Sequence, residues 1–312
     1  MKKTLLSLSL AALLSAGLSV GDAAWRPALA TEAATSAAAI VYERDWVVSP
    51  QAARELIAQG ALVLDVRDPK LKSKQPLPNA VPLVWQDLSE PALPTKGRLI
   101  ADDAVLTKKL QDLGVSKERP VVVVADPVNG WGEDGRIAWT LRTLGHSRAV
   151  LIDGGLPALV RDGAPAIAPA GGPGDFVVQR TDRFEVKRDD LKGLLGTPDL
   201  VVIDAREPRE YEGKTPYGET RGGHVPGARH IWYKDLLDKD GKLLPRAEIE
   251  KRLAALGASK DTPIVAYCTG GIRSGWFTSV LNDLGYKARN YAGSMWEWSA
   301  SPADAYPLTV KN

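Results

Sequence analysis

Cysteine is nearly absent from this sequence, since the chain of 312 residues contains only Cys268. A single cysteine cannot form an internal disulfide bond, which excludes the small secreted folds that depend on such bonds. An excess of charge of one sign is also missing, because 40 basic and 38 acidic residues leave a formal net charge of +2. A broad nucleic-acid surface needs a basic excess, so we predict no nucleic-acid partner.

Long apolar runs are missing after the N-terminus. There, two lysines precede a run rich in Leu, Ala and Ser that extends from Thr4 to about Val20. This layout is typical of a bacterial export signal, and the run is short for a membrane span of roughly 20 residues. We predict a signal peptide over residues 1–30, with cleavage after about Ala23 or Ala30, rather than an uncleaved anchor. A flexible lead-in over 31–44 and a periplasmic protein without a membrane segment would follow.

Helical and strand patterns alternate from about Asp45 onward. Runs of β-branched residues are typical of buried parallel strands, and glycines mark the ends of helices. The predicted strands are 61–67, 121–124 and 149–152, and the predicted helices are 49–57, 107–113 and 136–144. This alternation predicts an α/β fold in which helices flank both faces of a mainly parallel sheet.

The second half of the chain repeats the first. Asp65–Pro69 matches Asp204–Pro208 in both spacing and residue type, and similar pairs of segments follow along both halves. The repeat predicts two tandem copies of one α/β domain, over residues 45–160 and 183–305. The segment 161–182 is rich in proline and glycine, a composition typical of linkers.

Cys268 stands between a predicted strand, Ile264–Tyr267, and a predicted helix, Gly275–Leu284. In the loop between them, Gly270 and Gly271 can take φ > 0 and turn their N–H groups inward. Arg273 offers a planar fork for the paired oxygens of an anion, and Ser274 can cap the helix. Together these residues predict an anion-binding loop around a thiol of lowered pKa.

The first copy holds Ala125 or Asp126 at the position of Cys268, and neither residue can act as a sulfur nucleophile. Its loop, which extends to Gly135, is longer and carries acidic residues at Glu133 and Asp134. We therefore predict that the first domain is inactive and forms one wall of the cleft.

The segment Cys268-x-x-Gly271-x-Arg273-Ser274 resembles the active-site loop of the rhodanese (sulfurtransferase) family. Three further motifs are similar to those of the family's two-domain form, in Asp204–Glu207, Gly223–Ala228 and Gly293–Trp298. The resemblance covers nearly the whole chain after the predicted signal. In the tandem proteins of this family, only the second domain is usually active.

The resemblance implies ping-pong transfer of sulfane sulfur from thiosulfate, through a persulfide on Cys268, to a thiophilic acceptor such as cyanide or a thiol. It implies no metal and no organic cofactor, and we expect a monomer. The residues implied around the donor are those of the loop and two arginines: Thr269, Gly270, Gly271, Ile272, Arg273, Ser274, Arg206 and Arg209. For Arg206 the alternative is a structural salt bridge.

Other residues near these motifs are expected to be structural. His224 belongs to a motif that is structural in this family, and an ionised thiol needs no general base. Trp276, Trp296 and Trp298 are expected to pack in the core or in the cleft wall.

Three alternatives remain open. In mercaptopyruvate enzymes of the family, the loop resembles Cys-Gly-Ser-Gly-Val and lacks an arginine at the sixth place, so Arg273 favours thiosulfate. Related dual-specificity phosphatases have five residues between Cys and Arg, whereas four residues, Thr269–Ile272, separate them here. A persulfide carrier or sensor without steady turnover is compatible with the same loop.

Overall fold

The computed structural model describes residues 45–310, so the predicted signal peptide and lead-in lie outside the described residues. The first domain holds five parallel strands in the order β1-β5-β4-β2-β3. Their bounds are Val47–Val48 (β1), Leu62–Asp65 (β2), Val81–Pro82 (β3), Val121–Val124 (β4) and Ala149–Ile152 (β5). Within residues 45–310, no helix has the length and apolar character needed to cross a bilayer.

Local signals explain most helix positions in the first domain. Ser49 caps α1 by accepting a hydrogen bond from the backbone N–H of Ala52. Two helices begin earlier than predicted, because Asp102 caps α3 and because Gly132 adopts φ 83° just before α4. The helices are Pro50–Ala58 (α1), Pro69–Lys74 (α2), Trp85–Leu88 (η1), Asp103–Asp112 (α3), Glu133–Thr143 (α4) and Gly155–Leu159 (α5).

The second domain repeats this plan with four parallel strands in the order β7-β6-β8-β9. The strands are Val201–Asp204 (β6), Arg229–His230 (β7), Pro263–Tyr267 (β8) and Lys287–Asn290 (β9). The helices are Arg188–Leu194 (α6), Pro208–Tyr211 (α7), Tyr233–Leu236 (η2), Arg246–Ala255 (α8), Ile272–Asp283 (α9) and Ser294–Ala300 (α10). The predicted α/β class with two flanked parallel sheets is confirmed.

The strand register shows which residues of the two domains are equivalent. Asp65 pairs with Val124 and Asp204 pairs with Tyr267, so Ala125 occupies the position of Cys268. A glycine with φ near 80° precedes both α4 and α9. Asp134 therefore stands where the second domain has Arg273, and the first domain lacks both the thiol and the cation.

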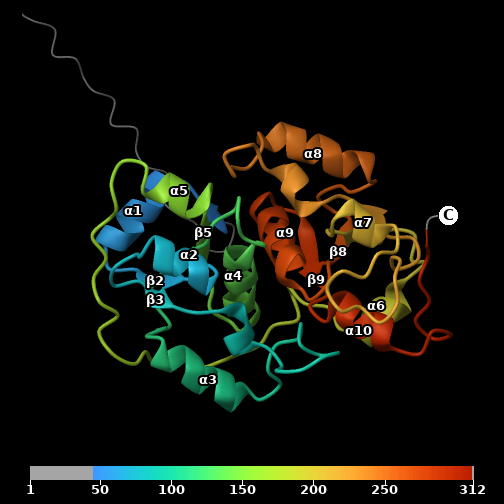
Figure 1. Ribbon diagram of the computed structural model, residues 1–312, viewed down its shortest axis with the longest axis horizontal. Coiled ribbons are helices and arrows are strands. Elements are labelled where there is room, and N and C mark those ends of the chain that lie inside the picture. The colour runs from blue at the N-terminus through green and yellow to red at the C-terminus, as the bar shows by residue number, and fades with distance from the viewer. Residues whose placement is uncertain (1–44, 311–312) are drawn as a thin grey trace, which may run out of the picture. The chain divides into compact units, whose positions relative to one another are not determined.

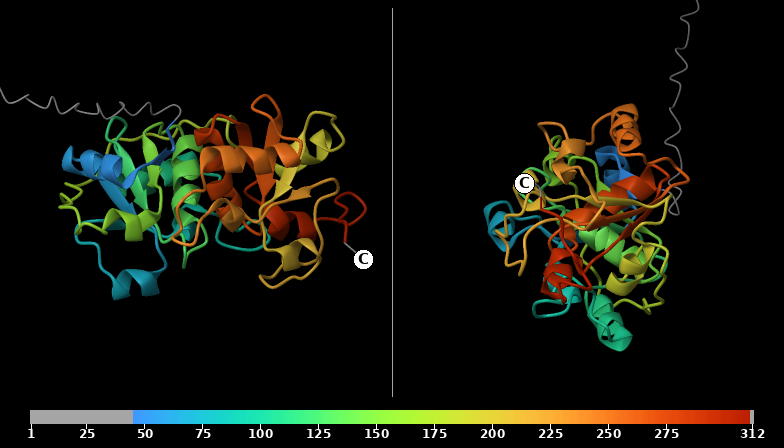
Figure 2. Two further views of the ribbon diagram at one scale, coloured as in Figure 1. Left: turned by 90° about the horizontal axis from the view of Figure 1, so that it is seen from above. Right: turned by 90° about the vertical axis from the view of Figure 1, so that its right-hand side faces the viewer.

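Helices α4 and α9 pack against each other between the two sheets (Figures 1 and 2). Glycine permits the close approach, because a Cβ atom added to Gly135 would lie 2.3 Å from the Cα of Trp276. The hydroxyl of Ser279 donates to the carbonyl of Gly135 at 3.0 Å, and one hydrophobic cluster extends through both domains. The active loop, at the start of α9, thus lies against the first domain.

The segment between the domains, 161–182, has no helix or strand, although its side chains are anchored to the first domain. Phe176 and Val178 are buried in the shared core. The backbone N–H of Val178 donates to the hydroxyl of Thr107 at 3.1 Å. The composition predicted a connection, but tertiary contacts hold its second half in place.

Candidate active site

Cys268 directly follows β8, at the carboxyl end of the second sheet. Ligands of parallel α/β sheets bind at this edge. The side chain is buried, and its Sγ accepts a hydrogen bond from the backbone N–H of Gly271 at 3.1 Å. The backbone N–H of Cys268 donates to the hydroxyl of Ser294, which fixes the thiol at the base of the loop.

The environment lowers the pKa of the Cys268 thiol below its ordinary value. Burial alone raises this pKa, but the charge of Arg273 and hydrogen bonds from Ser274 and Gly270 outweigh burial. The hydroxyl of Ser274 has one hydrogen, and here it donates to Asn290 Oδ1 at 2.7 Å. Because that hydrogen is already engaged, the backbone N–H groups and Arg273 are the partners that stabilise the thiolate.

Two details of the predicted loop are wrong. Of the two loop glycines, only Gly271 has positive φ, at 81°. A glycine is needed at position 270 for a different reason, because an added Cβ would lie 2.1 Å from the ring of Trp296. Ser274 does not cap the helix, since α9 already begins at Ile272 and its hydroxyl bonds Asn290. The helix begins earlier than predicted because Gly271, in the left-handed region, takes the cap position.

The guanidinium of Arg273 is occupied by the protein itself. Its Nη1 and Nη2 donate to the two carboxylate oxygens of Glu210 at 2.5 and 2.8 Å. The hydroxyl of Thr269 donates to the same carboxylate at 2.6 Å. A bidentate carboxylate fills the fork that the sequence assigned to a donor anion, so Arg273 acts on the thiolate mainly through its charge.

No role was predicted for Glu210 from the sequence. The spacing Glu207-x-x-Glu210 signals a helix start, and the two residues do form a capping box at α7. That local signal gives no indication that the carboxylate reaches Arg273, which lies 63 positions away. A second buried carboxylate, Glu219, accepts from the backbone N–H of Tyr217 and orients that part of the wall.

The predicted donor-binding role of Arg206 is wrong, because its side chain has no exposed surface. It forms a buried ion pair with Asp204 at 2.6 Å and donates to the carbonyl of Gly223. Its Nη1 has no hydrogen-bond partner among residues 45–310 but is sealed from solvent. The alternative, a structural salt bridge in the Asp-x-Arg motif, describes this residue.

Arg209 lies outside the pocket that contains Cys268. It is half exposed, pairs with Glu207, and donates to the hydroxyl of Tyr217 at 3.0 Å. The Glu207 partner raises the pKa of the Arg209 guanidinium. Arg209 therefore contacts the rim of the site through Tyr217.

The first domain contributes a buried arginine to the active loop. Arg136, in α4, donates from Nη1 to the carbonyl of Gly271 at 3.1 Å and from Nη2 to the carbonyl of Gly97 at 2.7 Å. Burial lowers the pKa of Arg136 to about 10, and the nearby charge of Cys268 opposes that shift. The sequence predicts a helix that begins at Arg136 but gives no sign of this role.

A pocket of about 150 Å³ lies above Cys268. Its walls are mainly aromatic: Trp85 and Trp131 come from the first domain, and Tyr217 and Trp296 come from the second. Thr269, Gly270, Ile272 and Arg273 complete the lining. The prediction that the first domain forms one wall is confirmed. The three tryptophans that were expected in the core or in the cleft wall divide between the two: Trp296 lines the wall, whereas Trp276 and Trp298 are buried.

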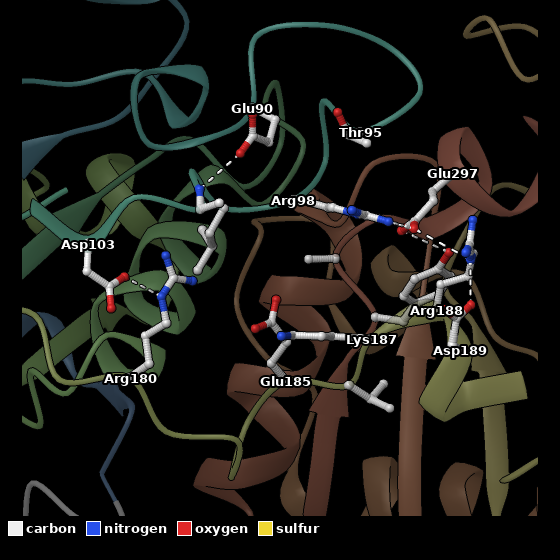
Figure 3. Close-up of a pocket in the computed structure, with 16 residues that line it drawn as sticks. Glu90, Thr95, Arg98, Asp103, Arg180, Glu185, Lys187, Arg188, Asp189 and Glu297 are labelled. Carbon is white, nitrogen blue, oxygen red and sulfur yellow. Dashed lines mark hydrogen bonds and ion pairs between the residues drawn. The ribbon is translucent and has the colours of Figure 1, made fainter. Parts of the chain in front are cut away.

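A second, larger cleft of about 710 Å³ is lined by Glu297, the residue after Trp296 in α10. Its charged side chains are largely paired with one another, as Figure 3 shows for Arg98 with Glu297 and Arg180 with Asp103. Cys268 is not among its lining residues. The reactive centre therefore belongs to the smaller, aromatic pocket.

Other candidate groups have structural partners. The Nδ1 of His224 lies 2.9 Å from the carbonyl of Tyr211, and the two rings stack at 3.8 Å. Between residues 45 and 310, no group of three or more His, Cys, Asp or Glu side chains is arranged to hold a metal ion.

Comparison with known proteins agrees with this geometry. A family model described as "Rhodanese-like domain" matches residues 49–162 and 187–301. The chain belongs to the rhodanese family. A "Thiosulfate sulfurtransferase" of Azotobacter vinelandii is 37% identical over 61% of this chain and 70% of its own length. One of the same name from Pseudomonas aeruginosa is 36% identical over 65% and 75%.

A solved structure has the same fold. The "3-mercaptopyruvate sulfurtransferase from Leishmania major" superposes with a TM-score of 0.66 at 22% identity, over 82% of this chain and 74% of its own. With the two curated relatives, the tandem domains establish this rhodanese as a sulfurtransferase enzyme.

Proposed function

We propose that the protein takes the outer sulfur of thiosulfate onto Cys268 and passes it to a thiophilic acceptor. The observation that carries the proposal is the buried Sγ of Cys268, which accepts a hydrogen bond from Gly271 beside the charge of Arg273. The names of the two curated relatives support thiosulfate as the donor.

In the first half-reaction, the Cys268 thiolate attacks the outer sulfur of thiosulfate. A bond forms between Sγ and that sulfur, the sulfur–sulfur bond of thiosulfate breaks, and sulfite leaves with the electron pair. The persulfide carries one negative charge, as the thiolate did. The N–H of Gly271 is already directed at Sγ and the charge of Arg273 lies beside it, so the loop favours the anionic persulfide.

Among residues 45–310, few cations are free to meet the donor. Both Nη groups of Arg273 are engaged by Glu210, and the Nζ of Lys96 lies 5.9 Å from the centre of the Trp296 ring. Arg209 reaches the rim through Tyr217. We therefore expect a high KM for thiosulfate, and we assign Lys96 and Arg209 to the path by which the dianion enters.

A donor comparison tests the proposal. Purified protein receives thiosulfate or 3-mercaptopyruvate with cyanide, and thiocyanate is measured with Cys268→Ser as control. We expect turnover with thiosulfate and none in the variant. Activity with mercaptopyruvate alone would show that mercaptopyruvate, not thiosulfate, is the donor. A single stoichiometric burst without turnover would show that the protein is a sulfur carrier. Full activity of Cys268→Ser would refute the persulfide.

We also propose export to the periplasm, where the protein would act as a monomer. The support is the lysine-led apolar run that ends near Val20. Fractionation of cells that express the whole chain tests this assignment, and N-terminal sequencing of the mature protein would locate the cleavage near Ala23 or Ala30.

A further inference from the structure

Four aromatic side chains enclose the approach to Cys268. Trp85 and Trp296 stack at 6.4 Å between ring centres, and Trp131 meets Tyr217 edge-to-face at 5.4 Å. Each of these pairs joins one residue of the first domain to one of the second. The aromatic cage, as we call these four residues, is therefore built jointly by the two domains.

The cage is held in place by polar contacts outside its cavity. The indole N–H of Trp296 donates to the carbonyl of Tyr217 at 2.8 Å, and the hydroxyl of Tyr217 donates to Glu207 at 2.9 Å. Arg273, the charged residue in the lining, lies 5.5 Å from the centre of the Trp131 ring and is bound to Glu210. The surfaces offered to a ligand are thus mostly aromatic and preorganised.

We infer that the sulfur acceptor is a small organic thiol with one flat, apolar group that stacks in the aromatic cage. This inference rests on the proposed function, because it concerns the second half-reaction of the same cysteine. Displacement at the persulfide requires the incoming sulfur to approach along the sulfur–sulfur bond, from the pocket side. The carbon group of that thiol then lies among Trp85, Trp131, Tyr217 and Trp296.

The volume of the pocket fits such a group. An apolar cavity of about 150 Å³ is large enough to hold benzene. Stacked and edge-to-face aromatic contacts stabilise beyond the burial of apolar surface, so each wall adds selectivity for a ring. Cyanide and sulfite carry no ring and cannot make these aromatic contacts.

The transfer balances without a further reactant. The acceptor thiolate attacks the outer sulfur of the Cys268 persulfide, a new sulfur–sulfur bond forms to the acceptor, and the bond to Sγ breaks. Cys268 leaves as a thiolate, and the outer sulfur, anionic in the loaded enzyme, takes up the proton that the acceptor thiol released, so the product is an organic persulfide.

The test compares two neutral thiols of similar acidity, benzyl mercaptan and 2-mercaptoethanol, with mercaptoacetate as an anionic probe. The persulfide is loaded with thiosulfate, excess donor is removed, and the loss of one sulfur atom from Cys268 is followed by mass spectrometry. We expect benzyl mercaptan to react about tenfold faster than 2-mercaptoethanol, with mercaptoacetate the slowest.

Trp131→Leu removes one wall, and we expect it to lower the ratio of the two neutral rates severalfold. Any effect of this variant on the persulfide itself cancels in that ratio. Val128→Ala is the matched control, since Val128 is exposed on the same loop and lies outside the pocket. It should leave the ratio unchanged.

Three results would overturn the aromatic acceptor. The first is a rate ratio of benzyl mercaptan to 2-mercaptoethanol near one, and the second is a ratio that Trp131→Leu does not change. The third is a fastest reaction with mercaptoacetate. If thiosulfate does not load Cys268, the proposed donor is wrong, and loading with inorganic polysulfide still allows the acceptor comparison. If neither reagent forms a persulfide, both proposals are wrong.

Discussion

Arg136 of the first domain donates a hydrogen bond to the carbonyl of Gly271 in the active loop of the second domain, at 3.1 Å. The side-chain amide of Asn290 donates to the same carbonyl at 3.1 Å. Two donors thus hold the carbonyl of Gly271, the residue whose own N–H donates to the Cys268 sulfur. The first domain, which has no thiol, therefore helps to position the residue that donates to the Cys268 sulfur.

Replacing Arg136 with methionine should raise the pKa of Cys268 and slow persulfide formation, because a cation near the thiolate and an anchor of the loop are both lost. The rate of alkylation by iodoacetamide against pH measures this directly, since the chain has one cysteine. The control is Arg142→Met, another buried arginine of α4, which contacts Asp45 and Ala149 instead. An identical pH profile in both variants would contradict the role of Arg136.

Removal of the Arg273 charge should also raise the pKa of the Cys268 thiol. The charge lowers the pKa of Cys268, so the thiolate of the native protein persists to lower pH than that of an ordinary thiol. In Arg273→Gln, alkylation should therefore require higher pH. The double variant with Glu210→Gln avoids an unpaired buried carboxylate and should show a smaller shift in the same direction, because a negative charge near the thiolate is lost as well. An unchanged midpoint in both the single and the double variant would rule out the electrostatic argument.

Glu210→Gln alone should destabilise the fold. It leaves the buried guanidinium of Arg273 without its carboxylate, and breaking one side of a buried pair costs about 3–5 kcal/mol. Chemical denaturation measures the change in free energy of unfolding. Glu250→Gln, which breaks surface pairs with Arg246 and Lys260, is the control and should have little effect. Equal stability of the two variants would show that the Glu210 pair is unimportant.

Gly270→Ala should close the aromatic pocket. The added Cβ would overlap the ring of Trp296, which must move or displace the loop. A displacement of about 1 Å near reacting atoms can cost about 100-fold, so we expect a loss of that order in kcat/KM. Gly193→Ala, in α6 with open space around it, should retain the activity of the native protein. Normal kinetics of Gly270→Ala would disprove the tight packing.

Asp134→Asn should flatten the dependence of stability on pH. Burial raises the pKa of Asp134 to about 7, whereas an unfolded aspartate titrates near 3.9. Between those values the native state holds a proton that the unfolded state lacks, so the free energy of unfolding falls as pH rises. Thermal unfolding from about pH 4 to 7 measures the slope. The surface variant Asp240→Asn should leave it unchanged, and an equally steep slope in Asp134→Asn would refute the assignment.

The cysteine, its loop and the tandem α/β plan were accessible from sequence because they depend on local patterns. A β-branched run followed by a glycine loop and a helix specifies its own strand and turn chemistry, and the repeat of Asp65–Pro69 in Asp204–Pro208 reports a duplicated fold. The predicted strands 121–124 and 149–152 match β4 and β5 for this reason.

Tertiary structure decided what surrounds the thiol. The carboxylate of Glu210 and the guanidinium of Arg136 reach the loop from 63 and 135 positions away, and no local pattern carries that information. Two arginines that the motifs assigned to donor binding have different environments. Arg206 lies in a buried ion pair with Asp204, whereas Arg273 lies beside the Cys268 thiolate. The sequence alone determined that this chain has one thiol at the end of a buried strand. Only the packing of α4 against α9 decided that aromatic side chains of both domains would enclose it, because a shared wall exists only where two folded surfaces meet.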